Sequence, residues 1–148
     1  MTTLFAAIVL LGVIVFVHEL GHYLAARSIG VKVERFSVGF PPRLMTFTSV
    51  VNGWEFRLFF YKKNKLGKYK WGTIYESIIS IPGRKGTSTE YCLAIIPFGG
   101  YVKVAGIIDE SMDTKYDRKP YELMSKSKWK QIWFQSAGVI MNLILAFI

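Results

Sequence analysis

The stretch Leu4–Ala26, LFAAIVLLGVIVFVHELGHYLAA, decides how the rest of the chain can be arranged. As a helix it would be about 35 Å long, enough to cross a bilayer with some tilt. The preceding residues, Met1-Thr2-Thr3, carry no basic group, and the apolar run continues through the histidines to Ala26. Both features argue against a cleaved signal peptide. We therefore expect a transmembrane helix over residues 4–26.

The same stretch carries the motif His18-Glu19-Leu20-Gly21-His22, which contains both histidines of the chain. Residues four apart on a helix lie on one face, about 6 Å apart along the axis. His18 and His22 can therefore bind one Zn²⁺ through neutral imidazole nitrogens, and Glu19 can reach the attacking water as a general base. Ionisable residues in a membrane-length helix usually mark a functional site. The sequence thus predicts His18 and His22 as metal ligands and Glu19 as the catalytic base.

The charges are confined to the middle of the chain. The formal net charge is +9, and all 19 Lys and Arg lie between Arg27 and Lys130. By the positive-inside rule, this distribution predicts that the loop 27–130 faces the cytoplasm. No nucleic-acid recognition motif accompanies the basic residues, so we expect no nucleic-acid partner. The single cysteine, Cys92, excludes an intramolecular disulfide and fits a reducing compartment.

Residues 31–105 have the alternation and turn residues of strands. Leu44–Val50 and Trp54–Phe60 flank Val51-Asn52-Gly53, which is a strong hairpin signal. Residues 91–105 are apolar but are broken at Gly99 and Gly100, which favours two short strands over a membrane span. An exposed strand edge there could hold an extended peptide by strand addition. Residues 31–105 are thus expected to form a small β region on the cytoplasmic side.

The last part of the chain is predicted to return to the membrane. Residues 106–131 form a linker and an interfacial segment with Lys126, Lys128, Trp129 and Lys130. Residues 132–148 are uncharged and apolar, and we expect them to be the start of a second transmembrane helix, truncated at the end of the chain. The expected fold is therefore a polytopic α-helical membrane protein, with a small membrane-associated β region between the first and second transmembrane helices.

Several stretches in this order resemble the site-2 protease family of intramembrane zinc metalloproteases, most closely the bacterial regulator-of-sigma-E protease branch. They are His18–His22, Ser37-Val38-Gly39-Phe40-Pro41, Glu90-Tyr91 through Pro97-Phe98-Gly99-Gly100-Tyr101-Val102-Lys103, Asp109-Glu110-Ser111, and Gly138–Ala146. Residues from about 50 to 87 look like an insertion when the chain is compared with shorter relatives, and we assign no function to them. The resemblance implies the N-terminal part of a zinc endopeptidase, residues 1–148, that cuts transmembrane segments of membrane proteins in the bacterial inner membrane.

The resemblance also implies roles for single residues and partners. His18 and His22 would bind zinc, Glu19 would activate water, and Asn142 would help to position the substrate. Gly99, Gly100 and Tyr101 would lie beside the site as part of a substrate-binding β element. The partners would be the lipid bilayer and a single-pass transmembrane substrate, such as an anti-sigma factor. The family's third zinc ligand, an aspartate in a Leu-Asp-Gly motif, is absent from this sequence, so we expect this fragment to be inactive alone.

Two other interpretations remain open at this stage. The chain could be a membrane-anchored binding module whose β region docks a partner without catalysis. It could also be part of a transporter or channel in which His18, Glu19 and His22 line an ion path. Zinc content distinguishes the protease from the binding module, since only the protease requires the metal.

Overall fold

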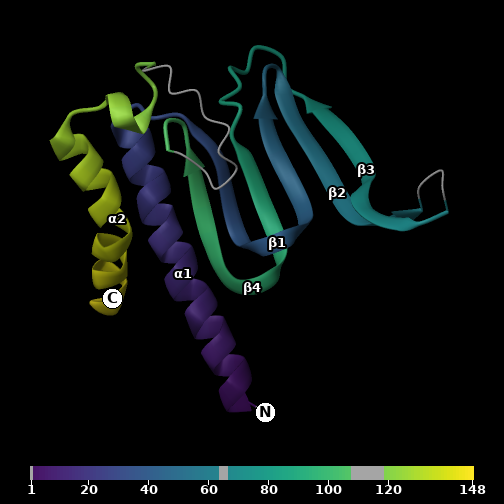
Figure 1. The fold of residues 1–148 in the computed structure, drawn as a ribbon, viewed down its shortest axis with the longest axis horizontal. Coiled ribbons are helices and arrows are strands. Elements are labelled where there is room, and N and C mark those ends of the chain that lie inside the picture. The colour runs from purple at the N-terminus through teal and green to yellow at the C-terminus, as the bar shows by residue number, and fades with distance from the viewer. Residues whose placement is uncertain (1, 64–66, 108–118) are drawn as a thin grey trace.

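The computed structural model describes residues 2–63, 67–107 and 119–148 (Figure 1). Two helices lie side by side at one end of the molecule, and a twisted sheet extends away from them. In chain order the elements are α1 (Thr2–Ser28), β1 (Val33–Val50), β2 (Gly53–Lys63), β3 (Tyr69–Ser80), β4 (Glu90–Val104), a 3₁₀ turn (Leu123–Ser125) and α2 (Lys128–Ala146).

Helix α1 ends in a glycine cap. The backbone N–H of Val31 donates to the carbonyl of Ala26, and the N–H of Gly30 donates to the carbonyl of Arg27. Gly30 has φ +68°, the left-handed conformation that glycine adopts without penalty. This cap turns the chain sharply from α1 into β1, so the start of the sheet is held against the end of the helix.

The four-stranded antiparallel sheet has the order β3-β2-β1-β4. β1 and β4 both bend sharply, and the first half of β1 lies between the two halves of β4 (Figure 1). Arg35 of β1 lies opposite both Lys103 and Glu90, and Phe36 lies opposite both Val102 and Tyr91. The first half of β1 is therefore flanked on both sides by β4, and the second half of β4 is left as an edge beside α1.

The predicted hairpin is present. Val50 pairs with Gly53, and Asn52 in the turn has φ +61°. The segment 50–87, which the sequence left without a function, supplies β2 and β3 and widens the sheet away from the helices (Figure 1).

Aromatic contacts fix the sheet on α1. The Phe36 ring lies 6.0 Å from the Phe16 ring and 5.5 Å from the Tyr23 ring, measured between centroids. The hydroxyls of Tyr23 and Tyr91 are hydrogen-bonded at 2.7 Å. The core sits where the end of α1 and the first half of α2 meet the start of β1 and the end of β4. It consists of Ala25, Ala26, Val31, Val33, Val104, Leu123, Phe134 and Ala137.

The expectation of a polytopic α-helical membrane protein is wrong for this chain. In the described part of the chain, more residues lie in strands than in α-helices. Only α1 there is long and apolar enough to cross a membrane. The second apolar segment misled the prediction, because α2 starts at Lys128, carries Lys130 and polar Gln135, Ser136 and Asn142, and uses buried Ala137 and Gly138 to pack on α1.

Candidate metal centre

The two histidines of α1 point to one place. His18 Nε2 and His22 Nε2 lie 3.2 Å apart, and both side chains are half-buried. The four-residue spacing brings them onto one face of α1, as the sequence predicts. Gly21 beside them is buried, and a Cβ there would lie 2.7 Å from Met141 Cγ of α2. The absence of a side chain at Gly21 therefore lets α2 approach the histidine face.

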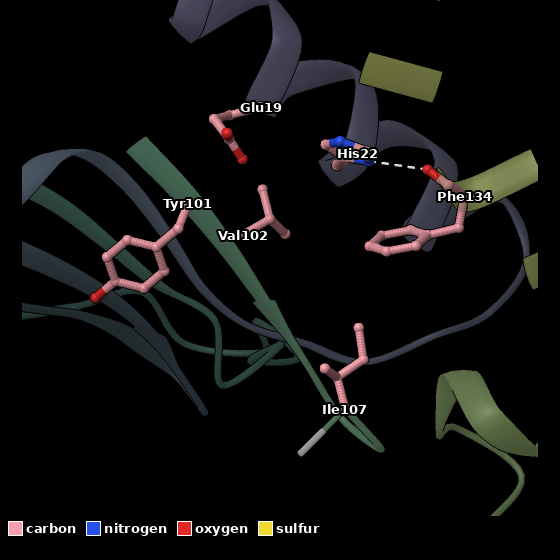
Figure 2. A pocket seen from close by; sticks show the side chains of 6 residues that line it. All are labelled: Glu19, His22, Tyr101, Val102, Ile107 and Phe134. Atoms are coloured by element: carbon pink, nitrogen blue, oxygen red, sulfur yellow. Dashed lines mark hydrogen bonds between the residues drawn. The ribbon is translucent and has the colours of Figure 1, made fainter. Parts of the chain in front are cut away.

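One stripe of α2 covers that face. Phe134, Gly138 and Asn142 are spaced four apart, like the histidines. The carbonyl of Phe134 lies 2.8 Å from His22 Nδ1 (Figure 2), and the amide nitrogen of Asn142 lies 3.3 Å from His18 Nδ1. Between them, a Cβ on Gly138 would lie 2.6 Å from the Nε2 atoms of both histidines. The absence of a side chain at Gly138 therefore lets the two Nε2 atoms converge against α2.

The converging imidazole pair fits a metal ion. Zinc takes neutral imidazole nitrogen at about 2.0–2.1 Å, and two nitrogens 3.2 Å apart can share an ion at that distance. The carbonyl of Phe134 can only accept, so His22 donates from Nδ1 and keeps its lone pair on Nε2. Among the described residues, no group of three or more His, Cys, Asp or Glu side chains could hold a metal. The described chain thus supplies an imidazole pair rather than a complete ligand set.

Glu19 lies next to the pair but faces the sheet. It lines a cavity of about 250 Å³ together with His22, Tyr101, Val102, Ile107 and Phe134 (Figure 2). Val102 of β4 lies across this cavity from the carboxylate. A carboxylate that opens on a cavity beside two imidazoles can take a proton from a water in that cavity.

The residues expected to bind substrate fall in two different places. Gly100 lies against α1, where a Cβ would come within 3.1 Å of Glu19 Cγ and 2.7 Å of the carbonyl oxygen of Ser37. Gly99, with φ +126°, lies at the bend of β4 against the Phe40 ring. Asn142 lies behind His18 on α2. Gly100 therefore lets the edge strand approach Glu19, Gly99 lies apart from the cavity against Phe40, and Asn142 contacts a predicted metal ligand.

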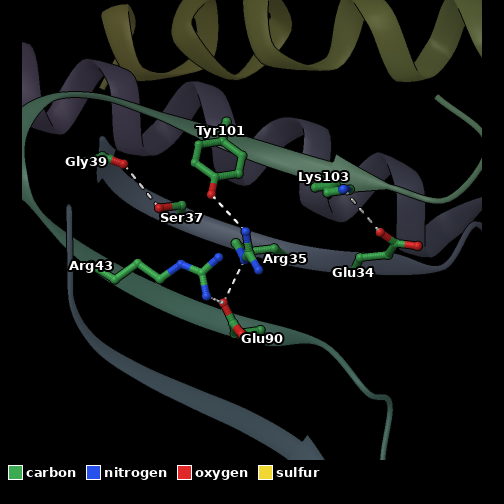
Figure 3. A network of polar contacts seen from close by, with 8 residues as sticks. All are labelled: Glu34, Arg35, Ser37, Gly39, Arg43, Glu90, Tyr101 and Lys103. Atoms are coloured by element: carbon green, nitrogen blue, oxygen red, sulfur yellow. Dashed lines mark hydrogen bonds and ion pairs between the residues drawn. The ribbon is translucent and has the colours of Figure 1, made fainter. Parts of the chain in front are cut away.

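Tyr101 belongs to a polar network on the other side of β4. Its hydroxyl accepts a hydrogen bond from Arg35 Nη1 at 3.2 Å (Figure 3). Glu90 Oε1 lies 2.6 Å from Arg35 Nε and 3.5 Å from Arg43 Nη1. Burial disfavours the charged guanidinium, but the Tyr101 hydrogen bond and the charge of Glu90 raise the pKa of Arg35. Tyr101 thus borders the cavity while its hydroxyl ties β4 to β1.

Sequence reasoning missed two contributions from α2. Neither Gly138 nor the carbonyl of Phe134 was identified as part of the site, although both lie against the imidazoles. The available signal was spacing, because positions 134, 138 and 142 repeat at the same interval as 18 and 22. It could be interpreted only once the two helices were known to pair.

An imidazole pair on a helix, with the next residue a carboxylate at a cavity, is the arrangement of the H-E-x-x-H zinc peptidases. Comparison with known proteins agrees. Residues 6–67 and 71–148 match peptidase family M50. The chain therefore belongs to this family, the site-2 proteases, as the sequence motifs predicted.

Three similar bacterial proteins carry the name "Putative zinc metalloprotease". The Chlamydia trachomatis protein is 32% identical over 142 residues, covering 92% of this chain and 17% of the relative. The Helicobacter pylori J99 protein is 30% identical over 141 residues, covering 95% and 30%. The Campylobacter jejuni protein is 34% identical over 143 residues, covering 96% and 28%. The chain thus spans less than a third of each of these relatives.

Proposed function

We propose that the chain carries the base and two of the three metal ligands of an intramembrane zinc endopeptidase. Membership of peptidase family M50 supports a zinc-dependent peptidase at the level of the family. The observation that carries the proposal for these residues is the convergence of His18 Nε2 and His22 Nε2 at 3.2 Å, beside a cavity that Glu19 lines.

His18 and His22 would hold the zinc ion through their Nε2 atoms. When bound, zinc acts as a Lewis acid that makes water acidic enough to lose a proton near neutral pH and that polarises a carbonyl group. Catalytic zinc sites use three protein ligands, and among the described residues no third His, Cys, Asp or Glu joins the pair. Because the chain spans less than a third of its relatives, we expect the third ligand from a longer protein. The fragment alone would then bind zinc weakly and would not turn over substrate.

Glu19 would act as the general base and then as the general acid. Its carboxylate would take the proton of the attacking water and later deliver it to the leaving amine. The carboxylate lines the cavity together with His22 and Val102, which places it where a water beside the histidines can be reached.

The edge of β4 would hold the peptide that is cut. An α-helical substrate hides its carbonyls in backbone hydrogen bonds, so it must be extended before attack. Residues 100–104 pair with β1 on one side only, and the other side borders the cavity through Val102. An extended segment added there by strand addition would pass between β4 and the metal position.

The apolar helix supports a proposal for the location and the substrate class. α1 has the length and composition of a membrane span, and its large apolar side chains near the N-terminus are exposed. We propose that the enzyme sits in the bacterial inner membrane with residues 27–130 on the cytoplasmic side. Its substrates would be single-pass transmembrane proteins, of which an anti-sigma factor is an example.

The test is zinc content and cleavage by the protein as its gene encodes it, purified in detergent and placed in liposomes. The probe is a single-pass membrane protein with a glycine-containing transmembrane segment. The parent should hold about one zinc, His22→Ala should lose it, and Glu19→Gln should keep zinc but lose cleavage.

Two outcomes would reject the proposal. Retained cleavage by Glu19→Gln would remove the base from the mechanism. A protein without zinc in either the parent or the His22→Ala form would instead favour a membrane-anchored binding module whose β region docks a partner.

A further inference from the structure

Helix α2 contacts the Nδ1 atom of both histidines. Moving along α2, the Phe134 carbonyl meets His22 Nδ1, and eight residues later the Asn142 side chain meets His18 Nδ1. The two rings therefore turn their Nδ1 atoms to α2 and their Nε2 atoms to each other. The partner of each Nδ1 decides whether the corresponding Nε2 carries a proton or a lone pair.

The two partners act differently. A backbone carbonyl only accepts, so Phe134 fixes the proton of His22 on Nδ1. The Asn142 side chain can donate through Nδ2 or accept through Oδ1. With Nδ2 facing the ring at 3.3 Å, His18 Nδ1 accepts, and the His18 proton sits on Nε2, where it can donate to His22 Nε2. This arrangement is consistent without a metal ion, but His18 then has no lone pair to offer one.

The arrangement has one unsatisfied atom. Asn142 Oδ1 is buried, and it has no hydrogen-bond partner among the residues that the structure describes. Leaving a buried acceptor unpaired is unfavourable. A half-turn of the amide would bring Oδ1 to His18 Nδ1, where it would accept the ring proton. Both Nε2 atoms would then carry lone pairs that face one point, and a cation at that point would offset their repulsion.

We propose that Asn142 is a positioning residue that sets the tautomer of His18, and that its amide turns over when a metal ion enters between the histidines. This inference rests on the proposed function, and it assigns Asn142 to the Nδ1 atom of the metal ligand His18 rather than to the substrate. Residues that hold the free nitrogen of a metal-binding histidine typically change metal affinity 10–100-fold when they are lost.

Three variants of the full-length protein test the proposal by zinc affinity, measured by competition with a chelating dye. Asn142→Leu removes the acceptor at similar volume and should weaken zinc binding about 10–100-fold. Asn142→Asp presents an oxygen in either orientation and should bind zinc at least as tightly as the parent. Gln135→Leu removes an exposed amide from the same helix and should leave the affinity unchanged.

A second readout follows the tautomer directly. In protein with ¹⁵N-labelled histidine, the parent without metal should carry the His18 proton on Nε2, and addition of zinc should move it to Nδ1. In Asn142→Asp the proton should sit on Nδ1 already before zinc is added. A loss of helix packing alone would not produce this difference between the aspartate and leucine variants.

The outcomes separate the inference from the proposed function. If the parent binds zinc but Asn142→Leu keeps the parent's affinity and tautomers, the inference is wrong, and a loss of cleavage alone would return Asn142 to a substrate role. If Asn142→Asp binds zinc as weakly as Asn142→Leu, the acceptor role is also excluded. If the parent and His22→Ala both lack zinc, the proposed function fails first.

Discussion

Gly138 offers the sharpest test of where the metal ion sits. A Cβ at this position would lie 2.6 Å from His18 Nε2 and 2.6 Å from His22 Nε2, whereas unstrained heavy-atom contacts are about 3.5–4.0 Å. An ion held at about 2.0–2.1 Å from both nitrogens on the α2 side of the pair would overlap with the methyl group. Gly138→Ala should therefore weaken zinc binding at least about 100-fold, which is about 2.7 kcal/mol.

The Gly138→Ala substitution should lower the stability of the fold less than it lowers the affinity for zinc. Alanine gains about 1 kcal/mol over glycine inside a helix, and the overlap with two imidazoles costs about 1–3 kcal/mol. The unfolding free energy should therefore fall by only about 0–2 kcal/mol, which thermal melting in detergent would detect as a small shift. Gly12→Ala is the matched control, since a Cβ there meets nothing within 4 Å. Parent-like zinc affinity in Gly138→Ala would show that the ion, if any, binds elsewhere.

The sheet offers three tests that do not involve the metal. Cys92 is 4% exposed and burial raises its pKa, so iodoacetamide should modify it at least about tenfold more slowly in the folded than in the denatured protein; equal rates would contradict its burial. Glu90→Gln removes the charge shared by Arg35 and Arg43 and should lower the unfolding free energy by about 1–2 kcal/mol in denaturant titrations, an estimate reduced for partial exposure. Burial and the Tyr23 hydrogen bond raise the pKa of Tyr91 to about 12. The stabilisation by the neutral Tyr91 hydroxyl should therefore be complete below about pH 10 and be lost as the pH rises toward 12. The Tyr91→Phe variant should lose less stability than the parent over that range.

Local patterns predicted α1 and the first hairpin correctly, whereas residues 91–105, expected as two short strands, form the single strand β4. The apolar run predicted α1 within two residues at each end. The Asn-Gly pair predicted the turn between β1 and β2, because a turn of two residues needs the positive φ that Asn52 adopts. The spacing of His18 and His22 predicted that their rings meet. Each of these features depends on residues close together in the sequence.

Long-range arrangement could not be predicted in the same way. Consecutive prolines such as Pro41 and Pro42 are typical of the end of a strand, but β1 bends there and continues to Val50. Nothing in the sequence of β1 indicates that Arg35 will lie opposite both Lys103 and Glu90. The same limit explains the wrong fold class, because an apolar segment such as residues 132–148 has one composition whether it faces lipid or packs on another helix. Asn142 was placed at the site by resemblance, but its contact with the rear of His18 required the pairing of α1 and α2.

The described contacts divide the site into two halves that different elements control. The imidazoles are fixed by α2, through the carbonyl of Phe134 and the side chain of Asn142. The carboxylate of Glu19 instead faces β4 across the cavity that Val102 also lines, and the strand comes that close because Gly100 has no side chain. A substrate strand that adds to the edge of β4 would therefore enter beside the carboxylate, whereas the contacts of α2 with the imidazoles lie away from this edge. Substrate binding would then act on Glu19 without disturbing the histidines, so metal binding and cleavage should respond to different substitutions.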